Sequence, residues 1–273
     1  MVELRPLTMA ESKRPYAKYY TRPMTPPADG IYEDIANPAD PALALSPHNI
    51  NDLLKPGPRA LERGWCELPD GSFYLAGYAD MPGVSTEMLE WWFAWHGLES
   101  LRYMIWDPDD HFAVNVKPDT IARRFDASLS WRERNWNTTD IVVEDVGTGV
   151  VTLEISFLSP EAVGYDMKKF NEGGFTAINA NICLQGHDQF VSFSHNARPT
   201  KTGVELRSCF WIGWIVENGQ RKRVAKDAPR AELARLAQGL SRHCAKEYHN
   251  LAAILPFVYK ENHGIIDKPE DFI

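Results

Sequence analysis

Residues 230–254, RAELARLAQGLSRHCAKEYHNLAAI, decide the fold and lie near the end of the chain. Ala, Leu, Glu and Arg dominate this stretch, and all four are strong helix formers. Asp227 is suited to cap the helix, Pro229 fits its first turn, and Pro256 predicts its end. The stretch therefore predicts one long helix close to the C-terminus.

Strand-forming sequence fills the chain before this helix. The segments rich in β-branched and aromatic residues are 72–78, 140–146, 150–157, 175–184, 190–197 and 204–216. Short turns at 147–149 (GTG) and 199–203 (PTKTG) separate neighbouring strands, and such short connections make the neighbours antiparallel. Strand after strand followed by one long helix predicts an α+β fold, with an antiparallel sheet curled around that helix.

The first part of the chain has a different character. Residues 1–65 are rich in proline, which prevents long regular elements. We expect only a helical turn at 49–54 there, followed later by short helices at 88–95 and 98–104. The expected division is a proline-rich N-terminal arm or subdomain over residues 1–84 and a main domain over residues 85–273.

Composition excludes several classes of protein. A formal charge of −8 argues against nonspecific nucleic-acid binding, which requires a basic surface. The four cysteines are scattered without a CxxC pair, which argues against a zinc ribbon and a disulfide framework. The first fifteen residues lack the apolar centre of a signal peptide, and no apolar run is long enough for a membrane span. We therefore expect a soluble cytoplasmic protein.

His243 and Glu247 are the sharpest local signal for chemistry. Residues four apart share one face of a helix, so the imidazole and the carboxylate can meet at one point. Nitrogen and oxygen ligands one turn apart suit zinc. The spacing is common, however, and taken alone it is more typical of a surface or structural pair than of a metal site.

A metal would need further ligands. His111 follows the acidic turn 107–110 (DPDD), and Glu144 lies inside the apolar strand 141–146. A carboxylate buried there would need a partner, although the period of 2 could equally direct it to solvent. His96, at the end of a predicted helix, is a rival ligand. His195 suits either proton transfer to a substrate or a structural role in the sheet.

Signatures of other enzymes are missing from the sequence. It contains no GxSxG elbow, no P-loop and no HExxH motif. The glycines do not cluster as a dinucleotide fingerprint requires.

Several ordered stretches resemble a known family. They are 49–54 (NINDLL), 81–84 (MPGV), 87–96 (EMLEWWFAWH), 101–103 (LRY), 105–106 (IW), 143–147 (VEDVG), 195–198 (HNAR) and 203–213 (GVELRSCFWIG). Together with the His243/Glu247 pair, they make the chain similar to the 2,4-diacetylphloroglucinol and phloretin hydrolases. The resemblance runs from about residue 49 to residue 247.

The resemblance implies a START-like helix-grip fold and a zinc site. Carried over residue by residue, the ligands that it implies are His111, Glu144, His243 and Glu247. It also implies that Tyr103 contacts the phenol, that Asn115 is a polar substrate contact, and that His195 lies in the pocket. At one position the sequence departs from the family, because Phe210 stands where the family pattern has a substrate-contacting tyrosine.

The function that follows from the resemblance is hydrolysis of the carbon–carbon bond between an acyl group and a polyphenolic ring. The catalytic residues we expect are Tyr103, Glu144 and His195, and the expected substrate contacts are Tyr103, Asn115, His195 and Phe210. The partner would be a small phenolic ketone, with no nucleic acid and no membrane, and the chain is expected to form a homodimer. Two alternatives stay open: a noncatalytic carrier of hydrophobic ligands, and a metal-free cyclase or isomerase of the same fold.

Overall fold

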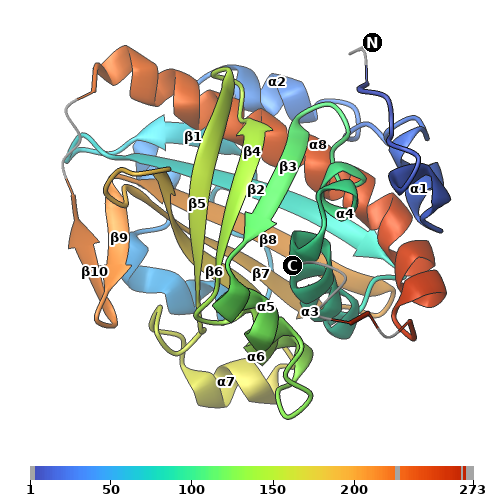
Figure 1. Cartoon of the computed structure of the whole chain (residues 1–273). Coiled ribbons are helices and arrows are strands. Elements are labelled where there is room, and N and C mark those ends of the chain that lie inside the picture. Colours follow the sequence, from blue (N-terminus) through green and yellow to red (C-terminus); the bar gives the residue numbers. More distant parts are fainter. Residues whose placement is uncertain (1–3, 225–227, 266, 269–273) are drawn as a thin grey trace.

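An eight-stranded antiparallel sheet curls about one long helix in the computed structural model, which describes residues 4–224, 228–265 and 267–268 (Figure 1). The strands are β1 Gly64–Glu67, β2 Phe73–Pro82, β3 His111–Val116, β4 Thr139–Asp145, β5 Val150–Leu158, β6 Thr176–Leu184, β7 Val191–Pro199 and β8 Gly203–Ile212. Their order across the sheet is β1-β2-β8-β7-β6-β5-β4-β3, so β1 and β3 form its two edges. The predicted α+β helix-grip fold is confirmed.

The remaining elements are short, apart from the last helix. A ribbon is formed by β9 Trp214–Glu217 and β10 Gln220–Arg223. The α-helices are α1 Ala17–Tyr20, α2 Ile31–Ala36, α3 Thr86–Trp95, α4 Ser100–Met104, α5 Pro118–Arg124, α6 Trp131–Asn135, α7 Met167–Glu172 and α8 Arg230–Asn262. The 3-10 helices are η1 Glu11–Lys13, η2 Pro41–Leu43, η3 Pro47–Leu54 and η4 His96–Leu98. None of the described helices is long and apolar enough to cross a membrane.

Helix α8 runs through Pro256 to Asn262, so the prediction that Pro256 ends it was wrong. Proline inside a helix costs ~3 kcal/mol, because one backbone hydrogen bond is lost and its ring crowds the preceding turn. Leu255 and Val258, beside that proline, are fully buried, and burying such side chains contributes about 1.5–3 kcal/mol each. Packing therefore carries the helix past the proline. Pro229 directly precedes the first helical residue, whereas the suggested cap Asp227 lies outside the described residues.

The predicted strand 204–216 is two strands. Gly213 adopts a left-handed φ of 94°, which turns the chain between β8 and β9. The turn at 199–203 joins β7 and β8 as an antiparallel pair, as predicted from its length.

The strands β2 and β8 are covered on both faces. Leu75 and Phe210 belong to the core that also contains α8, whereas Tyr74 and Trp211 belong to a second core on the opposite face. Ile50 and Leu53 of the N-terminal arm pack into this second core. This later part of the arm therefore lies against the back of the sheet, whereas Tyr16 and Ile35 from its earlier part belong to the first core. Because β1 and β2 precede residue 84, the sheet takes strands from both sides of the expected domain boundary.

The hairpin between β4 and β5 rests directly on α8. At Gly147, which has a φ of 87°, an added Cβ would lie 2.6 Å from the Cα of Gly239. Neither residue has a side chain, so the hairpin backbone and the helix backbone touch. This contact fixes the height of the hairpin above α8.

Candidate metal centre and cavity

His243 and Glu247 lie one turn apart on the face of α8 that points into the molecule. Both are buried, and His243 Nε2 lies 3.7 Å from Glu247 Oε2. The indole of Trp106 donates a hydrogen bond of 3.1 Å to the Glu247 carbonyl, and Asn250 donates one of 2.8 Å to the Trp106 carbonyl. These two bonds hold this part of α8 against the segment that leads into β3.

His111 and Glu144 come from neighbouring strands and occupy opposite positions in the β3–β4 ladder. Residues in β4 alternate between buried and half-buried positions, and Glu144 falls on the buried side with Val142. The solvent-facing alternative for Glu144 is therefore excluded. His111 Nε2 lies 3.6 Å from Glu144 Oε2.

The two pairs converge on one point. His111 Nε2 lies 3.2 Å from His243 Nε2 and 3.7 Å from Glu247 Oε2. A tetrahedral zinc ion with ligands at about 2.0–2.1 Å would hold its ligand atoms roughly 3.3 Å apart, which is close to these separations. Two imidazoles and two carboxylates are also a donor set that zinc accepts. The residues present therefore fit a divalent metal ion.

The rival histidine lies elsewhere. Within the described part of the chain, two groups of side chains have metal-ligand spacing, His111/Glu144/His243 and Asp107/Asp110/His243, and His96 belongs to neither. Glu247 also lies outside these groups, but its Oε2 is 3.7 Å from Nε2 of both His111 and His243. The side chain of His96 instead bonds the Trp92 carbonyl through Nδ1, at 2.8 Å.

An acidic turn, for which the sequence predicted no role, lies next to the candidate ligands on the side away from the point where they converge. His243 Nδ1 faces Asp110 Oδ2 at 3.5 Å and Asp107 Oδ2 at 4.0 Å, and these three residues form a second group with metal-ligand spacing. Lys246 pairs with both aspartates. His111 Nδ1 lies 3.2 Å from the Tyr103 carbonyl, so a backbone oxygen orients that ring. The signal in the sequence was the DPDD turn directly before His111.

The four ionisable groups shift one another's pKa values. Burial raises the pKa of Glu247 to about 8 and also raises that of Glu144. Burial lowers the pKa of His111, and the nearby His243 lowers it further. For His243, the carboxylates of Glu247, Asp110 and Glu144 outweigh burial and raise the pKa to about 10. A cation shared by all four groups would take the place of these protons.

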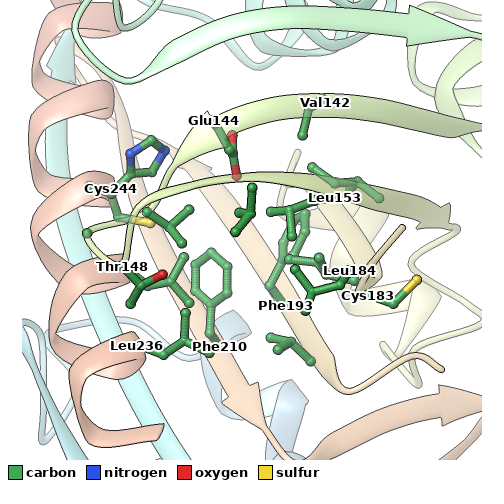
Figure 2. Close-up of a pocket in the computed structure, with 18 of the residues that line it drawn as sticks. Val142, Glu144, Thr148, Leu153, Cys183, Leu184, Phe193, Phe210, Leu236 and Cys244 are labelled. Atoms are coloured by element: carbon green, nitrogen blue, oxygen red, sulfur yellow. The ribbon is translucent and has the colours of Figure 1, made fainter. Parts of the chain in front are cut away.

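A cavity of about 660 Å³ opens beside these residues, within the range of pockets that take small molecules. Glu144 and Val142 reach into it from β4, Leu236 and Cys244 from α8, and Phe193 and Phe210 from the opposite wall (Figure 2). The rest of the wall is mainly apolar and includes Val151, Leu153, Ile155, Phe157, Ile182, Leu184, Phe190 and Val191. A flat apolar ligand with a few polar groups fits such a space.

Tyr103, His195 and Phe210 all line this cavity. The hydroxyl of Tyr103 donates a hydrogen bond to Glu144 Oε2, and its ring stacks on His111 with centroids 4.0 Å apart. His195 Nδ1 lies 2.8 Å from Ser208 Oγ, and burial lowers the pKa of this imidazole to about 3. Phe210 packs against both Phe193 and His195, which also contact each other.

Asn115, expected to be a substrate contact, is exposed and is not among the residues that line the cavity. A bulge shifts the β3 register between His111 and Ala113, so that Val114 is buried and Asn115 is exposed. Plain alternation from the buried His111 would have turned Asn115 inward.

Comparison with known proteins gives this site a context. The profile of the DAPG hydrolase family, described as DAPG hydrolase PhiG domain, matches residues 45–260. The chain belongs to this family. It is therefore a hydrolase, and the matched region contains all four candidate ligands.

Curated relatives agree with the family. Phloretin hydrolase from Eubacterium ramulus is 33% identical, over 92% of this chain and 91% of its own length. The 2,4-diacetylphloroglucinol hydrolase from Pseudomonas protegens is 30% identical, over 92% of this chain and 86% of its own. A solved structure titled "Crystal structure of Ara h 8.0201" matches 67% of this chain and 99% of its own, at 11% identity and a TM-score of 0.36. This likeness is too distant to inform the function.

Proposed function

We propose that this protein is a zinc-dependent hydrolase that cleaves the carbon–carbon bond between an acyl group and a polyphenolic, phloroglucinol-type ring. The products would be a carboxylic acid and the deacylated phenol. The observation that carries the proposal is the convergence of His111, Glu144, His243 and Glu247 on one point beside an apolar cavity. Membership of the DAPG hydrolase family supports the substrate class.

The four residues would hold the zinc ion, with Asp110 and the Tyr103 carbonyl orienting the two imidazoles. The ion would supply electrostatic chemistry, since it polarises a carbonyl oxygen and lowers the pKa of water. The reaction adds water across the broken bond. The oxygen of the water molecule joins the acyl carbon, and the ring carbon takes up a proton while the bond between these two carbons breaks.

The protein's own side chains would place the ring and handle that proton. Tyr103 holds its hydroxyl beside Glu144 at the cavity wall, where it can bind a phenolic oxygen and exchange a proton with the carboxylate. His195 is held by Ser208 and stays neutral in its apolar surroundings. It can therefore accept a hydrogen bond from a second phenolic hydroxyl or donate one to that oxygen. The apolar walls exclude bulk water, which strengthens these polar contacts.

The test combines metal analysis with product analysis. Purified protein should contain about one zinc ion per chain, and it should convert phloretin or 2,4-diacetylphloroglucinol to the deacylated ring and the free acid. Chelation should abolish turnover, and added zinc should restore it.

Two outcomes would reject the proposal in favour of its alternatives. Tight binding of these phenols without turnover would identify a carrier of hydrophobic ligands. Turnover that yields an isomer and survives complete zinc removal would identify a metal-free cyclase or isomerase. The cytoplasmic location and the homodimer stay predictions from the sequence.

A further inference from the structure

His96 is a buried cavity residue with no part in the metal centre. It follows α3 directly, is 3% exposed, and lines the cavity. Its ring lies between those of Trp92 and Tyr103, with centroid distances of 5.3 and 5.9 Å. The position of the imidazole is therefore fixed by stacking on both sides.

The hydrogen bond of His96 fixes which ring nitrogen carries the proton. Nδ1 lies 2.8 Å from the Trp92 carbonyl, and a carbonyl oxygen can only accept, so Nδ1 must donate. Burial keeps the ring neutral, since it lowers the pKa of His96 to about 3. Nε2 therefore presents a lone pair, and the hydrogen bond found for this ring among the described residues is the one made by Nδ1.

Asp140 provides a second acceptor beside His96. It lies on the same face of β4 as Val142 and Glu144, and it also lines the cavity. Arg124 Nη2 donates to its two oxygens at 2.6 and 2.8 Å, which leaves each oxygen able to accept again. Asp140 Oδ2 and Arg124 Nη1 both lie against Gly97, the neighbour of His96, because a Cβ there would be 2.5 Å from the former and closer still to the latter.

The two acceptors lie at different distances from the metal centre. His96 is separated from His111 by the ring of Tyr103, which stacks on both. Asp140 precedes Glu144 by four residues along β4, which corresponds to roughly 13 Å at ~3.3 Å per residue. Thr148 and Leu236 line the opposite end of the cavity, beyond Glu144. The cavity wall therefore offers two acceptors here, His96 Nε2 and the Asp140 carboxylate, and the carboxylate is also bonded to the Arg124 guanidinium.

We propose that His96 Nε2 and the Asp140 carboxylate form a hydroxyl-binding subsite, in which a phenolic hydroxyl of the substrate donates to His96. This inference rests on the proposed function and names a specificity determinant for it. An acceptor in an apolar cavity recognises a donor, because a ligand without one leaves the acceptor buried and unpaired. The hydroxyl can belong to the ring that leaves or to an aryl group at the far end of the acyl chain.

Three substitutions isolate the Nε2 acceptor. His96→Asn keeps an amide near Nδ1 for the Trp92 carbonyl but removes the group at Nε2, and His96→Phe keeps the stacked ring without nitrogens. His96→Gln can place an amide oxygen near Nε2. His249→Phe is the matched control, because His249 Nδ1 makes the same bond to the carbonyl four residues earlier, at 2.6 Å to Ala245, but does not line the cavity.

Each variant is tested with phloretin and two analogues. One analogue lacks the hydroxyl of the phenylpropanoyl group, and the other lacks the ring hydroxyl para to the acyl group. Ratios of kcat/KM measure the preference where wild type hydrolyses phloretin, and ratios of Kd from calorimetry measure it where wild type only binds. If the proposed function is wrong, the wild-type protein will not turn over phloretin. The ratios of Kd then still test the subsite.

Wild type should prefer phloretin over one of the analogues by about 2- to 10-fold, the effect of one hydrogen bond, and that analogue identifies the source of the hydroxyl. His96→Asn and His96→Phe should bring the ratio close to one, whereas His96→Gln and His249→Phe should retain a preference. Zinc content should stay unchanged in all four variants. The proposal would be overturned if wild type showed a ratio near one for both analogues or did not bind phloretin at all. It would also be overturned if His96→Asn left the ratio unchanged or if His96→Gln lost zinc.

Discussion

His111 and Glu144 face each other across the β3–β4 ladder, with His111 Nε2 3.6 Å from Glu144 Oε2. The register of two strands thus brings together side chains that are distant in the sequence. The other candidate ligands, His243 and Glu247, need only the repeat of one helix. The two halves of the centre therefore respond differently to mutation, because a register pair depends on the sheet and a helical pair does not.

The helical half is tested by the double variant His243→Ala/Glu247→Ala. We expect it to lose zinc and activity together, since two of the four ligands are gone. Metal analysis and turnover of an acylphloroglucinol measure both effects. Arg242→Ala, an exposed neighbour on α8, is the control and should keep both. Full zinc occupancy in the double variant would remove these residues from the site.

Asp110 is expected to act as a positioning residue for His243. Its carboxylate lies 3.5 Å from His243 Nδ1, so Asp110→Asn weakens the support of that ring. Loss of such support typically lowers metal affinity 10- to 100-fold, which competition with a chelator of known affinity can measure. Asp109→Asn in the same turn should have little effect, because Asp109 does not face His243. Equal affinities in the two variants would contradict the role of Asp110.

Phe210 should influence substrate preference. It lines the cavity. Because the resemblance described above implies a tyrosine at this position, we expect one phenolic oxygen of the substrate to lack a direct partner there. A neutral hydrogen bond contributes about 0.5–1.5 kcal/mol, so Phe210→Tyr should change relative rates several-fold without abolishing turnover. The measurement is a panel of acylphloroglucinols and acylresorcinols, with the more hydroxylated compounds favoured by the variant. Identical relative rates in both proteins would mean that Phe210 does not contact the substrate.

Gly239→Ala should destabilise the protein even though alanine is the better helix former. The added methyl group would collide with the Val146 carbonyl and the Gly147 backbone. Forced overpacking costs about 1–3 kcal/mol, which exceeds the gain of about 1 kcal/mol from helix propensity. Thermal unfolding should show a lower Tm, whereas Gly264→Ala, with open space around its Cβ, should leave the Tm nearly unchanged. An unchanged Tm for Gly239→Ala would show that the hairpin can move away freely.

The parts of the fold that follow from local pattern could be predicted from the sequence. Antiparallel pairing of β7 with β8 follows from a short turn, and the α8 helix follows from its composition. The end of α8 could not be predicted, because burial of Leu255 and Val258 outweighs the local effect of Pro256. The edge strand β3 was missed because its six residues adjoin turns and give no sustained alternation.

The candidate site shows the same limit. The spacing of His243 and Glu247 is readable from the sequence, but the contribution of β3 depends on a bulge that no local signal marks. That bulge turns Asn115, which the family resemblance implied as a substrate contact, to the outside. The Lys246–Asp110 pair and the acceptors at His96 and Asp140 depend on tertiary contacts alone.

The position of β3 at the edge of the sheet has a mechanical consequence. His111 stands on an edge strand, and no further strand of the described residues pairs with β3 on its outer side. An ion held jointly by His111, Glu144 and the two α8 residues would cross-link the edge of the sheet to helix α8. The same four bonds would then hold the cavity closed along one side, so that losing the ion would loosen the wall of the cavity before it disturbed the strands behind it.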